Sequence, residues 1–497
     1  MTKRLFRFLF VCTILLLLCP VAFAAEEEAQ QVTLTADYTG FQKAGFLTDG
    51  NVDKYFSAKE GSVINLSSDV PFSSLYIMFD LEYGEYIITD NTNNLDITAG
   101  TYSYLHEFIP LPKPTTSVTV YFSDGYVSLS EIRAYTAGTP SGIQIWEPPL
   151  EGDTDLLLMS THGDDEHLFF AGLLPIYAAE QDYNVQVAYL TNHREWTRKR
   201  CHEMLNGLWA VGVRNYPMFG TFKDFRIDNR DATYYTYEAN GTSKEELLSY
   251  VVEQIRRFRP QVVVGHDFKG EYGHGMHQVY ADLVSQAVFI TNDPNYFPES
   301  AEKYGLWDVP KTYFHVYPEN SVELELDAPL EAFGGMSAFD VSRYIGFPQH
   351  ESQQQFKEFT HWIYGPQKEV KDSKDIRKYS PRYYGLYRTT VGPDSDVNDL
   401  MENTKLYNER KRLEAERLAA EEAARLEAIR LEEERKAAEE AAALKKRLEE
   451  KRLKEEAEAR AQERKQLTLI LIATGVLVLL FVLGSITAKI SKKKKDC

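Results

Sequence analysis

Two short stretches of the sequence concentrate side chains that can bind a metal or move a proton. The first, HGDDE, places His162, Asp164, Asp165 and Glu166 directly after the apolar run LLLMS. A carboxylate is costly to desolvate without a partner, so these acids are not ordinary core residues. On its own the stretch fits two interpretations equally well. It is either a solvated turn whose acids favour the first turn of a helix, or a metal site.

The second stretch is HGMH, in which His274 and His277 lie three positions apart. At this spacing two side chains share one face of a helix. A single histidine is more often a hydrogen-bonded residue than a ligand, but two histidine-rich clusters favour a metal site. Imidazole and carboxylate together suit Zn²⁺ or a similar divalent ion. Two histidines and one aspartate would leave a coordination position open, as in catalytic zinc sites.

The surrounding pattern predicts how these stretches are positioned. Apolar runs of strand length alternate with helical stretches, at 154–160, 183–191 and 261–267 for the strands and near 198–211, 243–258 and 276–289 for the helices. Such alternation predicts an α/β domain with a mainly parallel sheet that is covered on both faces. In these sheets binding groups gather beyond the carboxyl ends of the strands, where both stretches fall.

HGDDE, followed about a hundred residues later by HGMH, resembles the PIG-L/LmbE-type zinc-dependent de-N-acetylase superfamily. The signature of that family is His-Pro-Asp-Asp-Glu with a later His-x-x-His. The resemblance covers roughly residues 150–390 and includes RKRCHEMLNGLWAVGV (198–213), PQVVVGHD and HESQ (350–353). It implies a Rossmann-like fold and hydrolysis of N-acetyl groups. Gly163 stands where the family usually has proline, which frees the turn but leaves the ligands intact.

The resemblance implies a role for each residue of the two motifs. His162, Asp165 and His277 would bind Zn²⁺ or another divalent metal. Asp164 would be the general base, and His274 would stabilise the oxyanion or protonate the leaving amine. Zinc lowers the pKa of its bound water and polarises the amide carbonyl, so zinc-activated water would be the nucleophile. A nearby carboxylate can take the proton of that water, and a nearby histidine can donate to the developing charge.

Other residues are assigned more loosely. Glu166 is expected either to support the metal ligands without binding the metal itself or to cap a helix. Arg200 and Tyr272 are candidates for substrate binding. For Arg200 an ion pair with Glu203 on the same helix is an equally good explanation, and for Tyr272 the alternative is an ordinary loop aromatic. The remaining expectations are that His350 and Gln353 close the pocket, that His193, His202 and His315 are structural, and that Cys201 is buried and inert.

Residues 26–140 are predicted to form an all-β sandwich that precedes the α/β domain of residues 145–400. Their apolar segments are short, rich in β-branched and aromatic residues, and separated by Gly, Asn, Asp and Pro. LTDGNVDKYF (47–56) and VSLSEIRAY (127–135) resemble a discoidin-like, galactose-binding-type sandwich, which implies carbohydrate binding. The segment contains no tryptophan, the usual platform for sugar faces, so a structural spacer stays an alternative.

The two ends of the chain predict a membrane protein. Residues 1–25 have the basic start, short apolar core and small residues of a secretory signal peptide. Residues 467–488 are uncharged and long enough to cross roughly 30 Å of hydrocarbon as a helix. The basic tail, 489–497, favours the cytoplasmic side. The chain is therefore expected to cross the cell membrane once, with its N-terminal part outside.

Residues 403–466 are predicted to form a long charged helix, because Ala, Glu, Lys, Arg and Leu dominate them. Acid-first pairs such as Glu432 and Lys436 support it. The leucines do not keep the stripe that a coiled coil needs. A solitary helical stalk of about 95 Å is therefore favoured over an oligomeric coil.

Together these observations predict a metal-dependent hydrolase that removes N-acetyl groups from an extracellular amino-sugar glycan or glycoconjugate. The net charge of −19 argues against nucleic acid as a partner. Cys201 is the only one of four cysteines expected in the mature outer part, so no disulfide is predicted there. Two alternatives stay open. One is a hydrolase of another amide, and the other is a non-catalytic, membrane-tethered glycan-binding protein.

Overall fold

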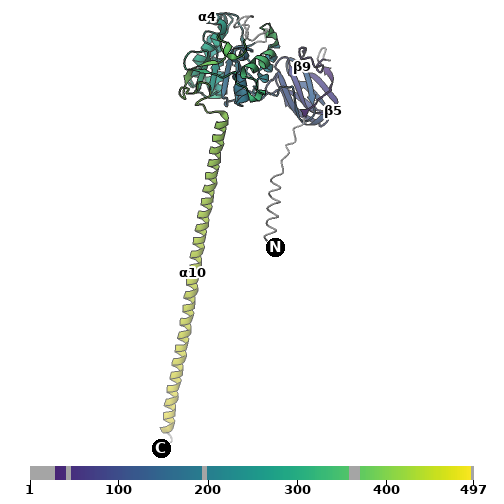
Figure 1. Cartoon of the computed structure of the whole chain (residues 1–497). Helices are drawn as coiled ribbons and strands as arrows, with labels where there is room; N and C mark the ends of the chain where they lie inside the picture. The colour runs from purple at the N-terminus through teal and green to yellow at the C-terminus, as the bar shows by residue number, and fades with distance from the viewer. Residues whose placement is uncertain (1–27, 41–45, 193–198, 357–369, 494–497) are drawn as a thin grey trace, which may run out of the picture. The chain divides into compact units, whose positions relative to one another are not determined.

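The computed structural model describes residues 28–40, 46–192, 199–356 and 370–493. The predicted signal peptide and His193 lie outside the described residues. The chain divides into two compact units, Met1–Glu409 and Arg410–Cys497. The first unit contains a β-rich part with strands β5 and β9 and an α/β part with helix α4 (Figure 1).

The β-rich part has, within the described residues, one eight-stranded sheet. The path β2-β9-β5-β8-β6-β7 is extended by β3, which pairs with β5, and by β4, which pairs with β9. Its strands are β2 (Gln31–Val32), β3 (Thr35–Thr39), β4 (Phe56–Ala58), β5 (Ser62–Phe79), β6 (Tyr86–Asp90), β7 (Leu95–Ala99), β8 (His106–Phe122) and β9 (Val127–Tyr135). The long strands β5 and β8 pair antiparallel with register shifts between Ser67 and Phe72, as at a β-bulge. The abundance of strands agrees with the prediction, and the discoidin-like class stays a prediction.

The α/β part is built on a mixed sheet of six strands, counted over the described ranges, in the order β12-β11-β15-β16-β18-β17. The strands are β11 (Leu156–Ser160), β12 (Val185–Tyr189), β15 (Val262–Gly265), β16 (Lys311–His315), β17 (Ser321–Glu323) and β18 (Tyr383–Thr389). The first four in this order are parallel, as predicted. The antiparallel β17 and β18 were not predicted, because neither has a long apolar run.

Side chains of β11 alternate between two cores, which shows that both faces of the sheet are covered. Leu156 and Leu158 belong to one core, which also contains residues of α3. Leu157 and Met159 belong to the other, which contains residues of α4, α5 and α6. The helices of eight or more residues in this part are α3 (Lys199–Ala210), α4 (Arg230–Ala239), α5 (Lys244–Phe258) and α6 (Gly275–Ile290). Three of them, α3, α5 and α6, lie within about two residues of the predicted ranges.

Local signals set the ends of α5. Ser243 precedes the helix and its Oγ accepts the backbone N–H of Glu246 at 3.1 Å. The helix ends at Phe258, where Arg259 takes a left-handed conformation with φ of 45° and Pro260 follows. The amphipathic helix between these points buries Leu247, Val251 and Ile255 against the sheet.

The β-rich part contacts α3 and the segment after it through buried and partly buried hydrogen bonds. Tyr76 Oη lies 2.7 Å from His106 Nδ1, and His106 Nε2 lies 2.8 Å from His202 Nδ1. Tyr216 Oη accepts the backbone N–H of Leu105 at 3.1 Å. His202 therefore joins the two parts of this unit.

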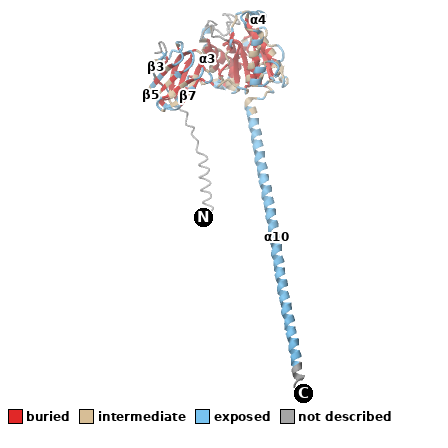
Figure 2. Cartoon of the chain, turned by 180° about the vertical axis from the view of Figure 1, so that it is seen from behind, coloured by how far each residue is buried: buried red, intermediate tan, exposed pale blue. Residues whose placement is uncertain are grey.

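The second unit lies almost entirely within the helix α10 (Tyr407–Lys493). Its side chains are exposed along the charged and the apolar segments (Figure 2). Ion pairs between neighbouring turns, such as Arg435 Nη1 to Glu439 Oε1 at 2.9 Å, occur in the charged segment. The helix is long and apolar enough near its end to cross a membrane.

Candidate metal centre

The predicted motifs meet at the carboxyl edge of the parallel strands. HGDDE follows β11, and the segment that leads to HGMH follows β15, which is the next strand in the sheet. The chain goes from β11 to β12 on one side and reaches β15 on the other, so the strand order reverses beside β11. Such a switch point opens a crevice for ligands. His277 lies in the first turn of α6 at this edge and is fully buried.

Three donor atoms form a small triangle. His162 Nδ1 lies 3.0 Å from Asp165 Oδ2 and 3.0 Å from His277 Nε2, and His277 Nε2 lies 3.2 Å from Asp165 Oδ2. Two ligands of a tetrahedral zinc ion, with bonds near 2.0–2.1 Å, lie about 3.3 Å apart. The triangle therefore has the size of three corners of such a site. The residues present fit a divalent metal with one position left open.

Hydrogen bonds on the far sides of the two rings orient the donor atoms. His162 Nε2 lies 3.1 Å from Asp224 Oδ1, and His277 Nδ1 lies 2.7 Å from Glu271 Oε2. A carboxylate accepts, so each outer nitrogen carries a proton and each inner nitrogen presents a lone pair. Two lone pairs at 3.0 Å repel unless a cation lies between them. This arrangement is typical of histidine ligands in metal sites.

The charges around the triangle favour a cation. Burial acts to lower the pKa of His162, but Asp224 and Asp165 outweigh it and raise that pKa to about 10. Burial also acts against His277, whose pKa Asp165 and Glu271 raise to about 9. Burial acts to raise the pKa of Asp165, but His277 and His162 hold that pKa well below its ordinary value. The carboxylates around the two histidines thus stabilise positive charge at the place where a metal would bind.

Glu271 is a hydrogen-bonding centre that sequence reasoning missed. Its carboxylate lies 2.7 Å from His277 Nδ1, 2.8 Å from His266 Nδ1 and 2.6 Å from His315 Nδ1. The His266 ring is itself fixed, because its Nε2 accepts the backbone N–H of Thr161 at 2.9 Å. Burial acts to raise the pKa of Glu271, but His266 and the other two histidines hold it well below its ordinary value. His315, expected to be structural, therefore supports a ligand through Glu271.

Asp164 lies beside the triangle. Its Oδ2 is 3.6 Å from Arg200 Nη2, and both side chains are nearly buried. Burial raises the pKa of Asp164 to about 7, against the opposing effect of Arg200. Arg200 Nη1 also lies 3.7 Å from Glu203 Oε2, so the structural pair considered from the sequence is present as well.

His274 and Tyr272 form another side of the site. His274 Nδ1 accepts the backbone N–H of Met276 at 3.2 Å, so the proton of the neutral ring is on Nε2. Burial lowers the pKa of His274 to about 2, which keeps the ring neutral. The ring of Tyr272 lies 5.4 Å from that of His274 and 5.5 Å from that of His277, between centroids. Tyr272 is about one-third exposed and has a left-handed backbone with φ of 46°.

Glu166 stabilises the loop after β11 through a hydrogen bond to its backbone. Its Oε2 accepts the backbone N–H of Asp164 at 2.9 Å, and its side chain is fully buried. His350 is also fully buried, with Nε2 3.5 Å from Glu166 Oε1. Cys201 is buried, as expected. The sequence pattern gave no signal for Asp224, which lies in a segment without regular periodicity.

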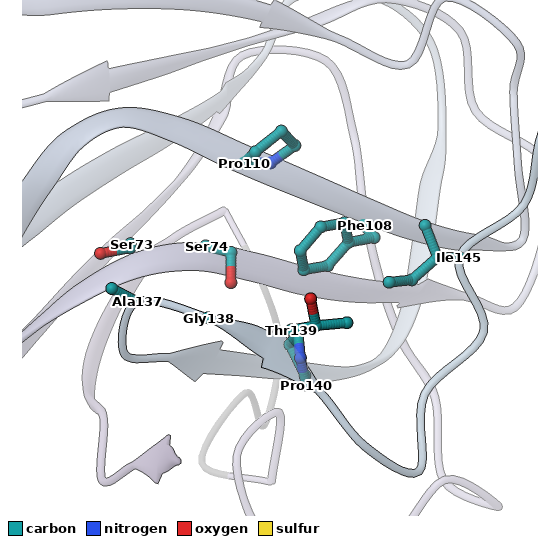
Figure 3. Close-up of a pocket in the computed structure, with 9 residues that line it drawn as sticks. All are labelled: Ser73, Ser74, Phe108, Pro110, Ala137, Gly138, Thr139, Pro140 and Ile145. Carbon is teal, nitrogen blue, oxygen red and sulfur yellow. The ribbon is translucent and has the colours of Figure 1, made fainter. Parts of the chain in front are cut away.

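Two cavities lie in the β-rich part. One of about 290 Å³ is lined by Ser74, Phe108, Thr139 and Ile145 among others (Figure 3). The other, of about 370 Å³, shares Phe108 and Ile145 and also includes Trp146, Glu107 and Tyr102. Tyr102 is 56% exposed and its ring stacks on that of Tyr104. Trp146, in the connection to the α/β part, thus gives this cavity the tryptophan that residues 26–140 lack.

Comparison with known proteins identifies the α/β part. Residues 157–288 match the family PIG-L: GlcNAc-PI de-N-acetylase, so this segment is a PIG-L family domain. The 1D-myo-inositol 2-acetamido-2-deoxy-alpha-D-glucopyranoside deacetylase 1 of Catenulispora acidiphila is 28% identical over 204 residues, which cover 37% of this chain and 62% of that protein. The 1D-myo-inositol 2-acetamido-2-deoxy-alpha-D-glucopyranoside deacetylase of Nocardiopsis dassonvillei is 25% identical over 230 residues, which cover 41% of this chain and 79% of that protein.

A solved structure, that of N,N'-diacetylchitobiose deacetylase from Pyrococcus horikoshii with its inhibitor MPG, aligns with 47% of this chain and 82% of that chain. The sequence identity is 14% and the TM-score is 0.30.

Proposed function

We propose that this protein is a metal-dependent de-N-acetylase that releases acetate from N-acetylated amino sugars of a glycan or glycoconjugate. The observation that carries the proposal is the triangle of His162, Asp165 and His277 donor atoms beside the buried Asp164. The family match is described as a GlcNAc-PI de-N-acetylase, and both relatives are named for deacetylation of a 2-acetamido sugar.

His162, Asp165 and His277 would hold the metal, with Zn²⁺ expected from two imidazoles and a carboxylate. When bound, such an ion polarises an amide carbonyl and acidifies a water molecule. The chain contributes the orientation of the ligands. Asp224 and Glu271 fix the two histidine rings so that the inner nitrogens converge.

Asp164 is proposed as the general base. Its carboxylate lies next to the ligand Asp165 in the sequence, and Arg200 holds it from the other side. Burial and Arg200 act in opposite directions on its pKa and leave it near neutrality, where a base can both take and return a proton.

His274 is proposed to donate a hydrogen bond to the oxygen that becomes negative when water attacks the acetyl group. Because Nδ1 accepts from Met276, Nε2 carries the proton and can donate it. Tyr272, at the partly exposed edge of the same site, is proposed to contact the sugar. Arg200 is proposed to position Asp164 and to face a hydroxyl of the substrate.

In this proposal the activity is attached to the cell membrane. The apolar end of α10 would cross the bilayer and its charged segment would act as a stalk. The predicted signal peptide and the lysines of the tail favour an outside location for the first unit.

The experiment that tests the reaction uses the full-length chain purified in detergent and loaded with Zn²⁺. Acetate and free amine are measured on N-acetylated glucosamine oligosaccharides and, in parallel, on N-acetylated peptides. Equal amounts of acetate and amine from the oligosaccharides alone support the proposal. Acetate from the peptides alone supports hydrolysis of another amide, and binding without acetate from any of them supports a non-catalytic glycan-binding protein.

A further inference from the structure

A second cluster of possible metal ligands lies behind the catalytic loop. Glu166, His167 and His350 each offer a donor atom, these atoms lie within 4.8 Å of one another, and all three side chains are fully buried. None of the three belongs to the triangle of the first site. We propose that these residues bind a second divalent metal ion, with Zn²⁺ as the expected occupant.

The distances suit this interpretation. Glu166 Oε1 lies 3.8 Å from His167 Nε2 and 3.5 Å from His350 Nε2. Both separations are too long for a hydrogen bond. They are slightly longer than the distance of about 3.3 Å between two ligands of a tetrahedral zinc ion, so a small contraction brings all three donors to bonding distance.

The environment of His167 supports its assignment as a metal ligand. Its side chain is fully buried, and within the described residues neither of its ring nitrogens makes a hydrogen bond. A buried polar group without a partner is strongly unfavourable. A metal ion bound to Nε2 would use one of these nitrogens and would account for an imidazole in this position.

Two glycines provide the space around the cluster. A Cβ atom at Gly207 would lie 2.7 Å from both His167 Nε2 and His350 Nε2, and one at Gly346 would lie 2.5 Å from His167 Nδ1. Gly207 is inside α3, where glycine is destabilising compared with alanine. Its presence there keeps open the side of the cluster on which the two Nε2 atoms converge.

The cluster is coupled to the proposed catalytic loop through Glu166. While Oε1 faces the two histidines, Oε2 accepts the backbone N–H of Asp164 at 2.9 Å. A metal ion on Oε1 would fix the carboxylate and, through it, the backbone of Asp164. The second ion is therefore a structural one, and it takes no part in the hydrolysis.

The test is the Zn²⁺ content of the full-length chain in detergent after removal of metal by a chelator, reloading and desalting. We expect two ions per chain in the unaltered protein and one in His167→Phe, in His350→Phe and in His277→Ala. The matched control is His202→Gln, which alters a partly buried histidine on α3 outside the cluster and should keep two ions. Using His350→Phe beside His167→Phe guards against a single variant that fails to fold.

One ion in the unaltered protein, or two in both His167→Phe and His350→Phe, would overturn the second site. These results are separate from those for the proposed reaction. Two ions without acetate release would leave this inference standing and remove the proposed function. If the unaltered protein holds one ion, and His277→Ala loses both that ion and acetate release, the second site is overturned and the proposed function stands.

Discussion

Arg200 Nη2 lies 3.6 Å from Asp164 Oδ2 inside the protein, so the proposed general base has a fixed cation as its neighbour. α3 supplies the arginine and the loop after β11 supplies the aspartate. Burial raises the pKa of Asp164 to about 7, and Arg200 opposes that increase. The position of α3 therefore affects the protonation state of Asp164, the proposed base.

Replacing Arg200 should therefore shift the pH dependence of the reaction. Without the guanidinium the pKa of Asp164 increases, and a base acts only when it is deprotonated. In Arg200→Met the acid limb of kcat/KM for acetate release should move to higher pH, and the rate at pH 7 should fall about tenfold or more. Lys199→Met, which removes the neighbouring exposed cation, should keep the original profile. An unshifted acid limb in Arg200→Met would show that Asp164 is not the titrating base.

Removing the charge of Glu271 should weaken metal binding. In Glu271→Gln the amide oxygen still accepts one hydrogen bond, but the carboxylate that orients His277 is lost. Mutation of a residue that hydrogen-bonds to a metal ligand typically reduces metal affinity by about 10–100-fold. The measurement is competition for Zn²⁺ against a chromophoric chelator. Asp267→Asn is the control, because Asp267 lies near Glu271 but does not contact the ligands. Equal affinities for both variants would contradict the role of Glu271.

The exposed ring of Tyr102 should contribute to glycan binding by the β-rich part. It borders the cavity of about 370 Å³, and aromatic faces stack on sugar rings. In the full-length chain with Asp164→Asn, which prevents turnover, adding Tyr102→Ala should weaken binding of N-acetylated oligosaccharides about fivefold. Tyr121→Ala alters another exposed tyrosine and should leave affinity unchanged. Titration calorimetry gives both values, and equal affinities would favour a structural spacer.

The apolar end of α10 should determine membrane attachment. A chain that ends at residue 466 lacks the apolar segment and keeps the charged one. After expression and cell breakage the full-length chain should remain in carbonate-washed membranes, whereas the shortened chain should be in the soluble fraction. If the shortened chain stays with the membranes, another segment attaches it.

The strands after which the two motifs occur could be predicted because buried parallel strands have uninterrupted apolar runs, such as LLLMS. Once the sheet was expected to be parallel, the meeting of the two motifs at its carboxyl edge followed from geometry. The structure confirms the parallel strands, and it places His162, Asp165 and His277 together.

The supporting residues could not be predicted in the same way. Asp224 reaches His162, and His315 reaches Glu271, across long sequence separations that no local pattern records. The antiparallel β18 was missed because YYGLYRT is short and interrupted by glycine. Tertiary packing, which a single sequence does not display, decides all three.

The most direct test of the central claim compares two variants of the full-length chain, Asp164→Asn and His277→Ala, for Zn²⁺ bound and for acetate released from an N-acetylated oligosaccharide. Asp164→Asn should bind as much Zn²⁺ as the unaltered protein and release acetate about 10²–10⁴-fold more slowly. His277→Ala should lose one bound ion and nearly all acetate release. Unchanged acetate release in both variants would contradict the assignment of this site as the catalytic centre.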